Sequence, residues 1–437
     1  MDIKGKKVLV LGMKISGVPA CYLLKRKEAI VTYYDDNVSP LNGEFINVTN
    51  LSIDEIFSDL YLIVTSPGFS SKHKILAEAA KRNIKVISEL ELGYRYINAP
   101  IIGVTGTNGK TTTVNMLHKI LSLMGFSVVK AGNVGYPLTQ VVIDVGKYDY
   151  VIVEASSFQL DYIDSFRCNI AILMNIAPDH MDRYDTFQDY VKAKKRIFAN
   201  QDFCDFALVN NDDLCAAAAA EDDIKSNIIF FGVKNGNSRI YIKDNYYMFE
   251  DKTICHVKES KAKGEHNKYN LLATMNAAAL LGAKREHCLN LIKDYVPLAH
   301  RIEYVATIGG KTFYNDSKGT NIHATKFAVA SVEGTVGLIM GGSDKNEDYC
   351  EFFEGLDPRV KYIAVTGSNA DKILSSAMKM GYTSISAQDD LASCIEKLNK
   401  SDVDTVLFSP SAASFDRYHD YAERGETFKR MVYEIKS

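Results

Sequence analysis

The residues with the clearest chemical purpose form a short turn between a predicted strand and a predicted helix. The turn reads Gly106-Thr107-Asn108-Gly109-Lys110-Thr111. Successive backbone N–H groups in such a turn, with a helix N-terminus behind them, bind phosphate oxygens. Lys110 would then reach the β- and γ-phosphates of a nucleotide, and the Thr111 hydroxyl would face Mg²⁺. The strict phosphate-loop pattern has glycine where this chain has Val104, but Gly106 still gives the turn the backbone freedom that it needs. The alternative is an ordinary glycine turn before a helix.

Two more polar positions follow predicted strands nearby. Glu154 closes the apolar strand 150–153, where phosphate-loop proteins place an acid that serves magnesium. The alternative for Glu154 is a solvated strand end. His180 lies in the polar loop 175–183, after another strand at 170–174. A lone histidine is more often structural than a ligand, so the loop alone leaves both roles open.

A basic helical stretch follows, with the four cations Lys192, Lys194, Lys195 and Arg196. Its simplest interpretation is a solvated helix face. An ammonium group beside Mg²⁺ is repelled, so a metal role for one of these lysines requires a change in its charge. Composition does not choose among them.

A second glycine-rich turn, 12–17, follows the predicted strand 7–11. It keeps the outer glycines of a dinucleotide-binding fingerprint, but it has Lys14 where the middle glycine normally allows close approach to a pyrophosphate. Asp35 follows at about the ~20-residue spacing of an acid that binds ribose. The turn therefore permits an NAD site but weakens that interpretation.

The chain alternates predicted strands and helices, which indicates mostly parallel, doubly wound sheets. The expected strands are 7–11, 29–34, 61–65, 101–104, 150–153, 170–174, 336–340, 362–366 and 405–408, and the expected helices include 19–27 and 111–124. Ala99-Pro100 is a predicted linker, because the residue before proline avoids helix. We predict an α/β protein of three domains: a Rossmann-like domain at 1–98, a central phosphate-loop domain at 99–297 and a Rossmann-like domain at 298–437. We expect the alanine run 216–220 to form a surface helix without a function.

Composition excludes several other classes of protein. The chain has 437 residues, which at about 150 per domain suggests two or three domains. The 46% hydrophobic and 24% charged fractions are typical of globular proteins, and the net charge of −3 argues against a general nucleic-acid binder. No apolar run reaches ~18 residues, so no membrane span is expected. The chain starts with charged residues that run directly into a predicted strand, which predicts no signal peptide. Its eight cysteines are scattered and form no Cys-x-x-Cys pair, which indicates isolated thiols in a reducing cytoplasm.

Eight motifs in order along the chain carry a resemblance to a known family. They are GTNGKT at 106–111, EASSFQL at 154–160, DHMDRY at 179–184, GEHNKYN at 264–270, HRIE at 300–303, NDSKGTN at 315–321, GGSDK at 341–345 and SPSAASFD at 409–416. The chain resembles the ATP-dependent Mur ligases, and within them the branch that adds D-glutamate. The resemblance implies that ATP activates a carboxylate as an acyl phosphate, which the amine of D-glutamate attacks to form an amide. It also implies UDP-N-acetylmuramoyl-L-alanine as the other substrate, a monomeric protein in the cytoplasm, and no nucleic-acid or membrane partner.

The resemblance further implies two magnesium sites. Thr111 and Glu154 would serve the magnesium of ATP, while His180 and Lys194 would serve a second one. The family position that matches Lys194 carries a carbamate derived from CO₂, which converts a repelled ammonium into an anionic ligand. The expected catalytic residues are therefore Lys110, His180 and Lys194.

Residues for the other ligands are implied in the same way. For ATP they are Gly106, Thr107, Asn108, Gly109, Lys110, Thr111, Thr112, Asn267, Asn270, Arg301 and Asp316. For the uridine nucleotide, held by the first domain, they are Ser16, Asp35, Ser66, Gly68 and, from the second domain, Asn133. For D-glutamate, held by the third domain, they are Thr320, Lys345, Ser414, Phe415 and Tyr421. The effect of Lys14 on diphosphate binding is left open.

Three other classes of protein fit parts of the pattern. They are a Mur ligase for a different amino acid or a folylpolyglutamate synthetase, a phosphate-loop switch protein, and an NAD-dependent dehydrogenase. NDSKGTN and SPSAASFD favour the D-glutamate branch. Because water must be kept from an acyl phosphate, we expect the third domain to close when ATP and substrate bind.

Overall fold

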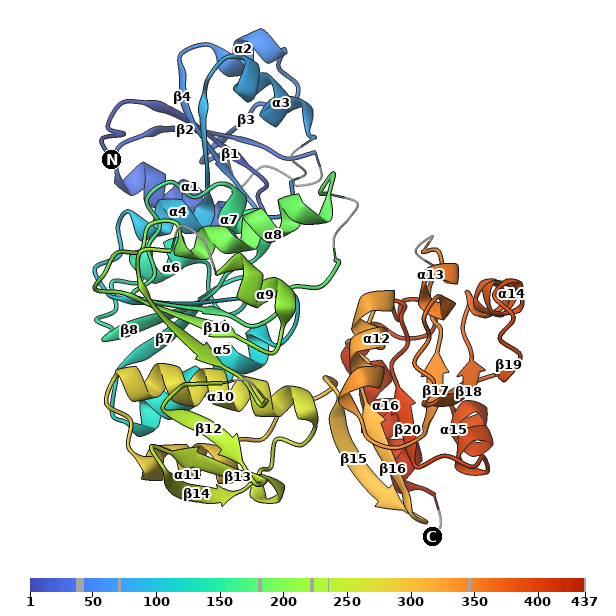
Figure 1. The fold of residues 1–437 in the computed structure, drawn as a ribbon. Coiled ribbons are helices and arrows are strands. Elements are labelled where there is room, and N and C mark those ends of the chain that lie inside the picture. The colour runs from blue at the N-terminus through green and yellow to red at the C-terminus, as the bar shows by residue number, and fades with distance from the viewer. Residues whose placement is uncertain are drawn as a thin grey trace. The chain divides into compact units, whose positions relative to one another are not determined.

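The computed structural model describes residues 1–36, 43–69, 72–179, 183–220, 224–234, 236–344 and 347–435. Residue contacts divide the chain into two compact units, which are drawn in Figure 1. The first unit comprises Met1–Glu259 with Tyr269–Lys293, and the second comprises Ser260–Lys268 with Asp294–Ser437. Within the described ranges, no helix combines the length and the apolar character that a membrane crossing needs.

A five-stranded parallel sheet forms the N-terminal part of the first unit, in the order β3-β2-β1-β4-β5. Its strands are β1 (Lys7–Leu11), β2 (Ile30–Tyr34), β3 (Ile46–Asn47), β4 (Leu60–Thr65) and β5 (Lys85–Ser88). The helices along it are α1 (Gly17–Arg26), α2 (Ile53–Phe57), α3 (Lys74–Lys81) and α4 (Glu89–Tyr94). Apolar clusters lie on both faces of the sheet, so the central strands are buried on both sides, as parallel sheets require.

A six-stranded parallel sheet forms the middle part, in the order β11-β10-β9-β6-β8-β7. Its strands are β6 (Ile101–Thr105), β7 (Val128–Gly132), β8 (Tyr150–Glu154), β9 (Ile170–Leu173), β10 (Phe206–Asn210) and β11 (Asn227–Phe231). Its helices are α5 (Lys110–Leu123), α6 (Leu138–Ile143), α7 (Ser157–Asp161), α8 (Phe187–Lys195), η1 (Arg196–Phe198) and α9 (Leu214–Ala219). Because β9, β6 and β8 are neighbours, the loops at their carboxyl ends meet at one edge, where such sheets bind ligands.

A small antiparallel sheet and two helices complete the first unit. The sheet consists of β12 (Ile240–Lys243), β13 (Tyr246–Phe249) and β14 (Lys252–His256). A short 3-10 turn, η2 (Val257–Glu259), follows it. The helices are α10 (Glu265–Leu280) and α11 (Arg285–Asp294). The first turn of α10 belongs to the second unit, so this helix runs across the division between the units.

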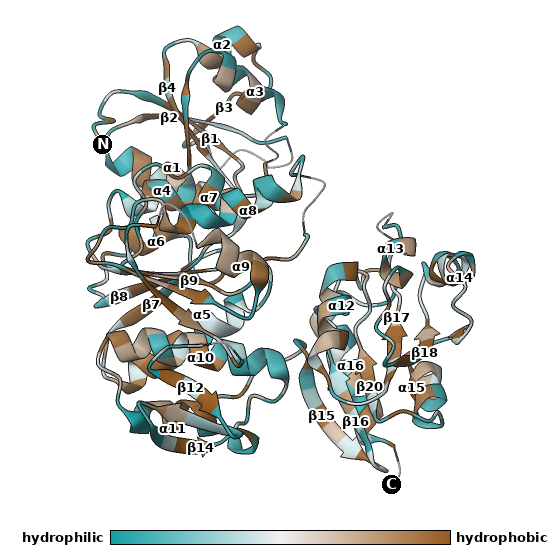
Figure 2. Ribbon diagram, viewed as in Figure 1, coloured by the Kyte–Doolittle hydropathy of each residue, from teal (hydrophilic) through white to brown (hydrophobic). Residues whose placement is uncertain are grey.

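The second unit contains a six-stranded sheet in the order β15-β16-β20-β17-β18-β19. Its strands are β15 (Glu303–Ile308), β16 (Lys311–Asn315), β17 (Val336–Met340), β18 (Val360–Val365), β19 (Ile385–Ala387) and β20 (Thr405–Phe408). Only β15 runs antiparallel to its neighbour in this described sheet. The helices are α12 (Ile322–Ser331), α13 (Cys350–Phe353), α14 (Ala370–Lys379), α15 (Leu391–Asn399) and α16 (Tyr421–Tyr433). Figure 2 shows β17 and β18 as hydrophobic, and all of β17 is buried.

The predicted α/β class with mostly parallel sheets is confirmed. Each expected strand and helix is present with ends within two residues of the prediction. The domain boundaries at residues 98 and 297 remain predictions. The alanine run was expected to form a surface helix, and it forms most of α9, which is capped by Asp213. Leu214 and Ala218 are exposed, whereas Ala216, Ala219 and Ala220 pack into the apolar cluster of the middle sheet.

Helix α4 fastens the N-terminal sheet to the middle sheet through two buried carboxylates. Glu91 accepts the backbone N–H groups of residues 164–166 at 2.8 to 3.1 Å, and the Nε of Arg95 at 2.7 Å. Glu89 Oε1 accepts both the backbone N–H and the hydroxyl of Thr139, at 2.7 and 2.6 Å. Because each carboxylate binds several donors of the middle sheet, the two sheets are held as parts of one unit.

The other oxygen of Glu89 is buried without a hydrogen-bond partner, and burial raises the pKa of Glu89 to about 7. The folded protein therefore retains this proton at a pH where the unfolded chain has lost it. The free energy of unfolding should fall as pH rises from about 4.5 to about 7. Glu89→Gln cannot ionise, so it should remove about 3 kcal/mol of this pH dependence in urea unfolding. The exposed Glu286→Gln is the control, and an unchanged pH dependence in Glu89→Gln would contradict the prediction.

Candidate active site

The predicted phosphate loop connects β6 to α5 in a backbone conformation that needs glycine. Gly106 has a φ of 150° and Gly109, the N-cap of α5, has a φ of 85°. A Cβ on Gly109 would lie 2.5 Å from the Asn270 side-chain oxygen, which itself accepts a hydrogen bond from the Thr113 hydroxyl at 3.3 Å. The loop and the N-terminus of α5 are thus positioned as the sequence predicts, with Asn270 directly against them.

Asn175, which follows β9, ties the phosphate loop to the neighbouring strand end. Its backbone oxygen accepts Thr107 N at 2.9 Å, and its side-chain oxygen accepts Asn108 N at 2.8 Å. Its side-chain nitrogen donates to Asn108 O at 3.1 Å. The sequence did not single out Asn175 for this role. Its position at the end of a predicted strand was the available signal.

Two lysines, one from α5 and one from α8, meet at a single carbonyl oxygen of the loop. Lys110 Nζ and Lys194 Nζ each donate to Gly106 O at 2.8 Å, and Lys110 also donates to Thr107 O at 2.8 Å. Lys194 is only 2% exposed, which corrects the interpretation of 192–196 as a solvated face. Burial, and then the charge of Lys110, hold the pKa of Lys194 well below its usual value. These surroundings therefore favour the neutral amine of Lys194 more than water does.

Tyr190 supports this lysine from one helical turn earlier. Its hydroxyl lies 3.1 Å from the Thr107 hydroxyl, and the Lys194 ammonium lies 4.5 Å from the centre of its ring. The sequence analysis did not identify Tyr190, although a spacing of four residues places two side chains on the same helix face.

Glu154 ends β8 with a buried carboxylate that is only half satisfied. Its Oε1 accepts the side-chain N–H of Asn133 at 2.9 Å, whereas its Oε2 is buried and has no hydrogen-bond partner among the described residues. Its charge also acts on Lys194. Among the described residues no group of three His, Cys, Asp or Glu side chains forms a metal site. His180 lies outside the described residues. Thr111 and Thr112 begin α5 beside the loop.

A cavity of about 390 Å³ in the N-terminal sheet gathers four of the five residues predicted for the uridine nucleotide. They are Ser16, Asp35, Ser66 and Gly68. Lys14, which stands where a fingerprint normally has its middle glycine, also lines the cavity. The fifth predicted residue, Asn133, does not line this cavity and instead pairs with Glu154.

The first glycine turn is held by contacts that only a glycine allows. Asp35 Oδ2 accepts Met13 N at 2.7 Å, so this acid fastens the turn. The Ser66 hydroxyl donates to Gly12 O at 3.2 Å. A Cβ on Gly17 would lie 1.7 Å from that same carbonyl oxygen, so the outer glycine is required for packing.

The second unit presents Arg301 from a strained turn. The flanking residues His300 and Ile302 have φ values of 64° and 48°. Asp316 is buried, accepts Ile302 N at 3.2 Å and the Ser409 hydroxyl at 2.7 Å, and has its pKa raised by burial to about 7. In the same unit the Asn267 side chain donates to Lys263 O at 2.7 Å.

Thr320, Ser414 and Phe415, predicted for D-glutamate, lie on two loops that a buried arginine joins, and the sequence did not single out this arginine. Ser414 is buried, Phe415 is 75% exposed and Thr320 is partly buried. Tyr421 begins α16, where the Lys318 ammonium lies 4.0 Å from its ring centre. Lys345 lies outside the described residues. Arg424, 3% exposed, donates to the backbone oxygens of Ala412, Ala413 and Ser317 at 2.9 to 3.0 Å.

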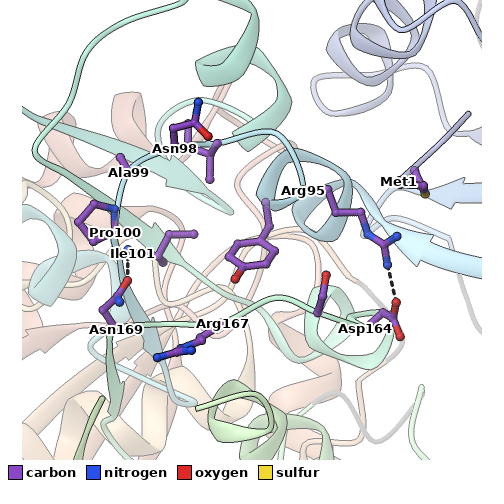
Figure 3. A pocket seen from close by; sticks show the side chains of 12 residues that line it. Met1, Arg95, Asn98, Ala99, Pro100, Ile101, Asp164, Arg167 and Asn169 are labelled. Atoms are coloured by element: carbon purple, nitrogen blue, oxygen red, sulfur yellow. Dashed lines mark hydrogen bonds and ion pairs between the residues drawn. The ribbon is translucent and has the colours of Figure 1, made fainter. Parts of the chain in front are cut away.

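A cavity of about 760 Å³ lies elsewhere in the first unit, along the linker 97–101 (Figure 3). Arg95 and Arg167 border it, and Figure 3 shows Arg95 directed at Asp164. Each of these arginines pairs with two carboxylates. Since both charges are already balanced, we assign this cavity no ligand.

Two family models match the chain. The Mur ligase middle domain matches residues 104–278, and the Mur ligase, glutamate ligase domain matches residues 300–412. A protein of Caldanaerobacter subterraneus is 35% identical over 450 aligned positions, and one of Thermoanaerobacter pseudethanolicus is 36% identical over 458. Both alignments cover the whole of both chains, and both relatives are named UDP-N-acetylmuramoylalanine–D-glutamate ligase.

Solved structures with low sequence identity share the fold. A pseudomurein peptide ligase type C from Methanothermus fervidus has a TM-score of 0.59 at 17% identity, covering 99% of this chain and 100% of its own. The UDP-N-acetylmuramate-alanine ligase MurC from Thermotoga maritima has a TM-score of 0.55 at 17% identity, with 98% and 100% coverage. The MurF ligase from Thermotoga maritima, solved in complex with ADP, has a TM-score of 0.58 at 18% identity, with 87% and 91% coverage.

The requirement for glycine at 109 can be tested directly. Gly109→Ala places a methyl group against the Asn270 side chain and strains a positive φ, so it should weaken nucleotide binding at least about tenfold. Gly125→Ala, at the other end of α5, has a similar φ of 90° with open space around it. This control should lose stability without losing nucleotide affinity. Equal affinities of the two variants in a fluorescent-nucleotide titration would contradict the prediction.

Proposed function

The chain belongs to the Mur ligase family, and from that premise we propose that it joins D-glutamate to UDP-N-acetylmuramoyl-L-alanine at the expense of ATP. The observation that carries the proposal is the convergence of Lys110 and Lys194 on Gly106 O, with the half-satisfied Glu154 carboxylate acting on the same charges. This arrangement suits a reaction that brings a phosphate and a carboxylate, both anionic, into contact. The two full-length relatives named as D-glutamate ligases support this choice of substrates.

The proposed chemistry has two steps. A carboxylate oxygen of UDP-N-acetylmuramoyl-L-alanine attacks the γ-phosphorus of ATP, the bond to the β-phosphate oxygen breaks, and ADP leaves. The neutral amine of D-glutamate then attacks the acyl carbon, phosphate leaves, and the amide nitrogen loses a proton. Lys110 holds the phosphate oxygens in both steps, after exchanging its two backbone carbonyl partners for them.

The residues present fit a divalent cation. Within the described part of the chain, Glu154 Oε2 is a buried carboxylate oxygen without a hydrogen-bond partner, and carboxylate and hydroxyl oxygens are ligands that Mg²⁺ prefers. Glu154 and Thr111 would hold the cation of ATP, and His180 with Lys194 as its carbamate would hold a second. When bound, Mg²⁺ balances the negative charge that develops on the phosphoryl oxygens. The carbamate forms when the neutral Lys194 amine adds to CO₂ and releases one proton.

The remaining ligands follow the placement of the predicted residues. The 390 Å³ cavity with Lys14, Ser16 and Ser66 would take the uridine nucleotide. The loops at Thr320 and Ser414, together with Lys345, Phe415 and Tyr421, would take D-glutamate in the second unit. Arg301, Asp316, Asn267 and Asn270 would complete the ATP site. We propose that the protein acts as a monomer in the cytoplasm. Its C-terminal domain would close when ATP and substrate bind.

The substrate assignment is tested by an amino-acid panel. With ATP, Mg²⁺ and UDP-N-acetylmuramoyl-L-alanine, only D-glutamate should give stoichiometric release of phosphate. L-glutamate, meso-diaminopimelate and L-lysine are the controls. Activity with one of these instead would assign another amino-acid ligase, such as a folylpolyglutamate-type enzyme. Phosphate release without either co-substrate would indicate a nucleotide-hydrolysing switch.

The role of Lys194 is tested by removing its amine. Lys194→Ala should lose activity by at least about 10³-fold, and added short carboxylic acids should restore part of it, because they supply the missing anionic ligand. Lys192→Ala, on the exposed side of the same helix, should keep wild-type activity. Full activity of Lys194→Ala in the absence of added acid would rule out the carbamate.

A further inference from the structure

One arginine of the first unit connects the loop that lines the proposed uridine cavity to the loops of the phosphate site. Arg183 NH1 donates to Pro67 O at 2.8 Å, and its NH2 donates to Gly68 O at 3.1 Å. Both carbonyl groups belong to the loop after β4, and Pro67, Gly68 and Phe69 line the 390 Å³ cavity. Arg183 itself belongs to the loop after β9, in the DHMDRY motif of the middle sheet.

The same guanidinium also contacts a third segment. Its central carbon lies 4.3 Å from the ring centre of Phe158, which belongs to α7 immediately after β8 and Glu154. The Phe158 ring stacks on Tyr184 with a centroid separation of 5.9 Å and an interplanar angle of 12°. Three motifs that are far apart in sequence therefore meet at one side chain.

The chemistry of this contact requires arginine rather than any cation. A planar fork donates to two carbonyls at once while its face stacks on an aromatic ring, and an ammonium group cannot do both. In the described part of the chain, Arg183 donates only to neutral carbonyl groups, so its charge is not cancelled by a carboxylate. Arg183 does not itself line the cavity, so it acts through the carbonyl groups of Pro67 and Gly68, which do.

A second contact joins the same two loops but carries less weight. Lys72 Nζ and Asp185 form an ion pair at 3.0 Å, with side chains that are 63% and 80% exposed. Exposed pairs of this kind contribute about 0 to 1 kcal/mol. Arg183, which is partly buried and makes several contacts, is the main connection between the loops.

We propose that Arg183 is a positioning residue that fixes the 66–69 wall of the nucleotide cavity to the loop carrying His180. A substrate that contacts both the 66–69 wall and the loop after β9 must span the distance between them. Arg183 holds that distance constant. The identity of the ligand as a nucleoside diphosphate rests on the proposed function, whereas the connection between the loops does not.

Kinetics separate this role from catalysis and from general stability. Arg183→Ala should raise the KM for UDP-N-acetylmuramoyl-L-alanine by about 10- to 50-fold, while the KM for ATP and kcat stay within about threefold of wild type. Arg183→Lys keeps the charge and one donor, so it should recover part of the lost affinity. Arg26→Ala is the matched control, because Arg26 also donates to a middle-sheet carbonyl, Ile143 O at 2.8 Å, away from the cavity. The control should leave every KM unchanged.

Hydrogen exchange without any ligand tests the connection independently of the reaction. Backbone amides of residues 66–69 should exchange faster in Arg183→Ala than in wild type or Arg26→Ala, whatever the protein's substrate. A loss of kcat with unchanged KM, an equal rise in all KM values, or unchanged exchange at 66–69 would each overturn the proposal. A wild-type protein inactive on the nucleotide substrate, with the exchange result intact, would instead refute the proposed function alone.

Discussion

The site depends on the sharing of one backbone oxygen, Gly106 O, by two lysine side chains. Two ammonium groups at this distance repel each other, and burial removes the water that would screen them. The strain is relieved when Lys194 is neutral, which agrees with the lowered pKa of that group. A neutral amine is also the form that reacts with CO₂, and a carbamate there would reverse the local charge. The surroundings of Lys194 therefore favour the chemistry that the proposed reaction requires.

This sharing is possible only because three strand ends are held together. Asn175 ties the end of β9 to the phosphate loop after β6, and Glu154 at the end of β8 is held by Asn133. The N-terminal sheet is attached separately, by the carboxylates of α4. Buried carboxylates that accept several backbone N–H groups form stiff connections, since breaking one leaves several donors unpaired. Rigidity of the first unit is thus built from polar contacts and not from apolar packing alone.

The sequence was sufficient for the sheets and for the phosphate loop, because strand periodicity and glycine spacing are local properties. Four of the residues predicted for the uridine nucleotide, Ser16, Asp35, Ser66 and Gly68, do line one cavity, and their role there stays a prediction. The sequence could not show that Asn133 pairs with Glu154, or that Arg183 and Arg424 connect distant loops. Those contacts join residues far apart in the chain, and periodicity says nothing about them. The resemblance to the family, in contrast, had singled out Lys194 among the neighbouring lysines as the expected carbamate position.

The backbone of the second unit is strained at the turn that carries Arg301. A positive φ is costly for a β-branched residue, at about 1 to 3 kcal/mol, yet Ile302 has a φ of 48°. The turn persists because Asp316 accepts Ile302 N and Lys318 N donates to His300 O. Both partners belong to the loop 315–321, which Arg424 also ties to the loop of Ala412 and Ala413. Arg301, which we propose for ATP, and the loops proposed for D-glutamate therefore share one support within this unit.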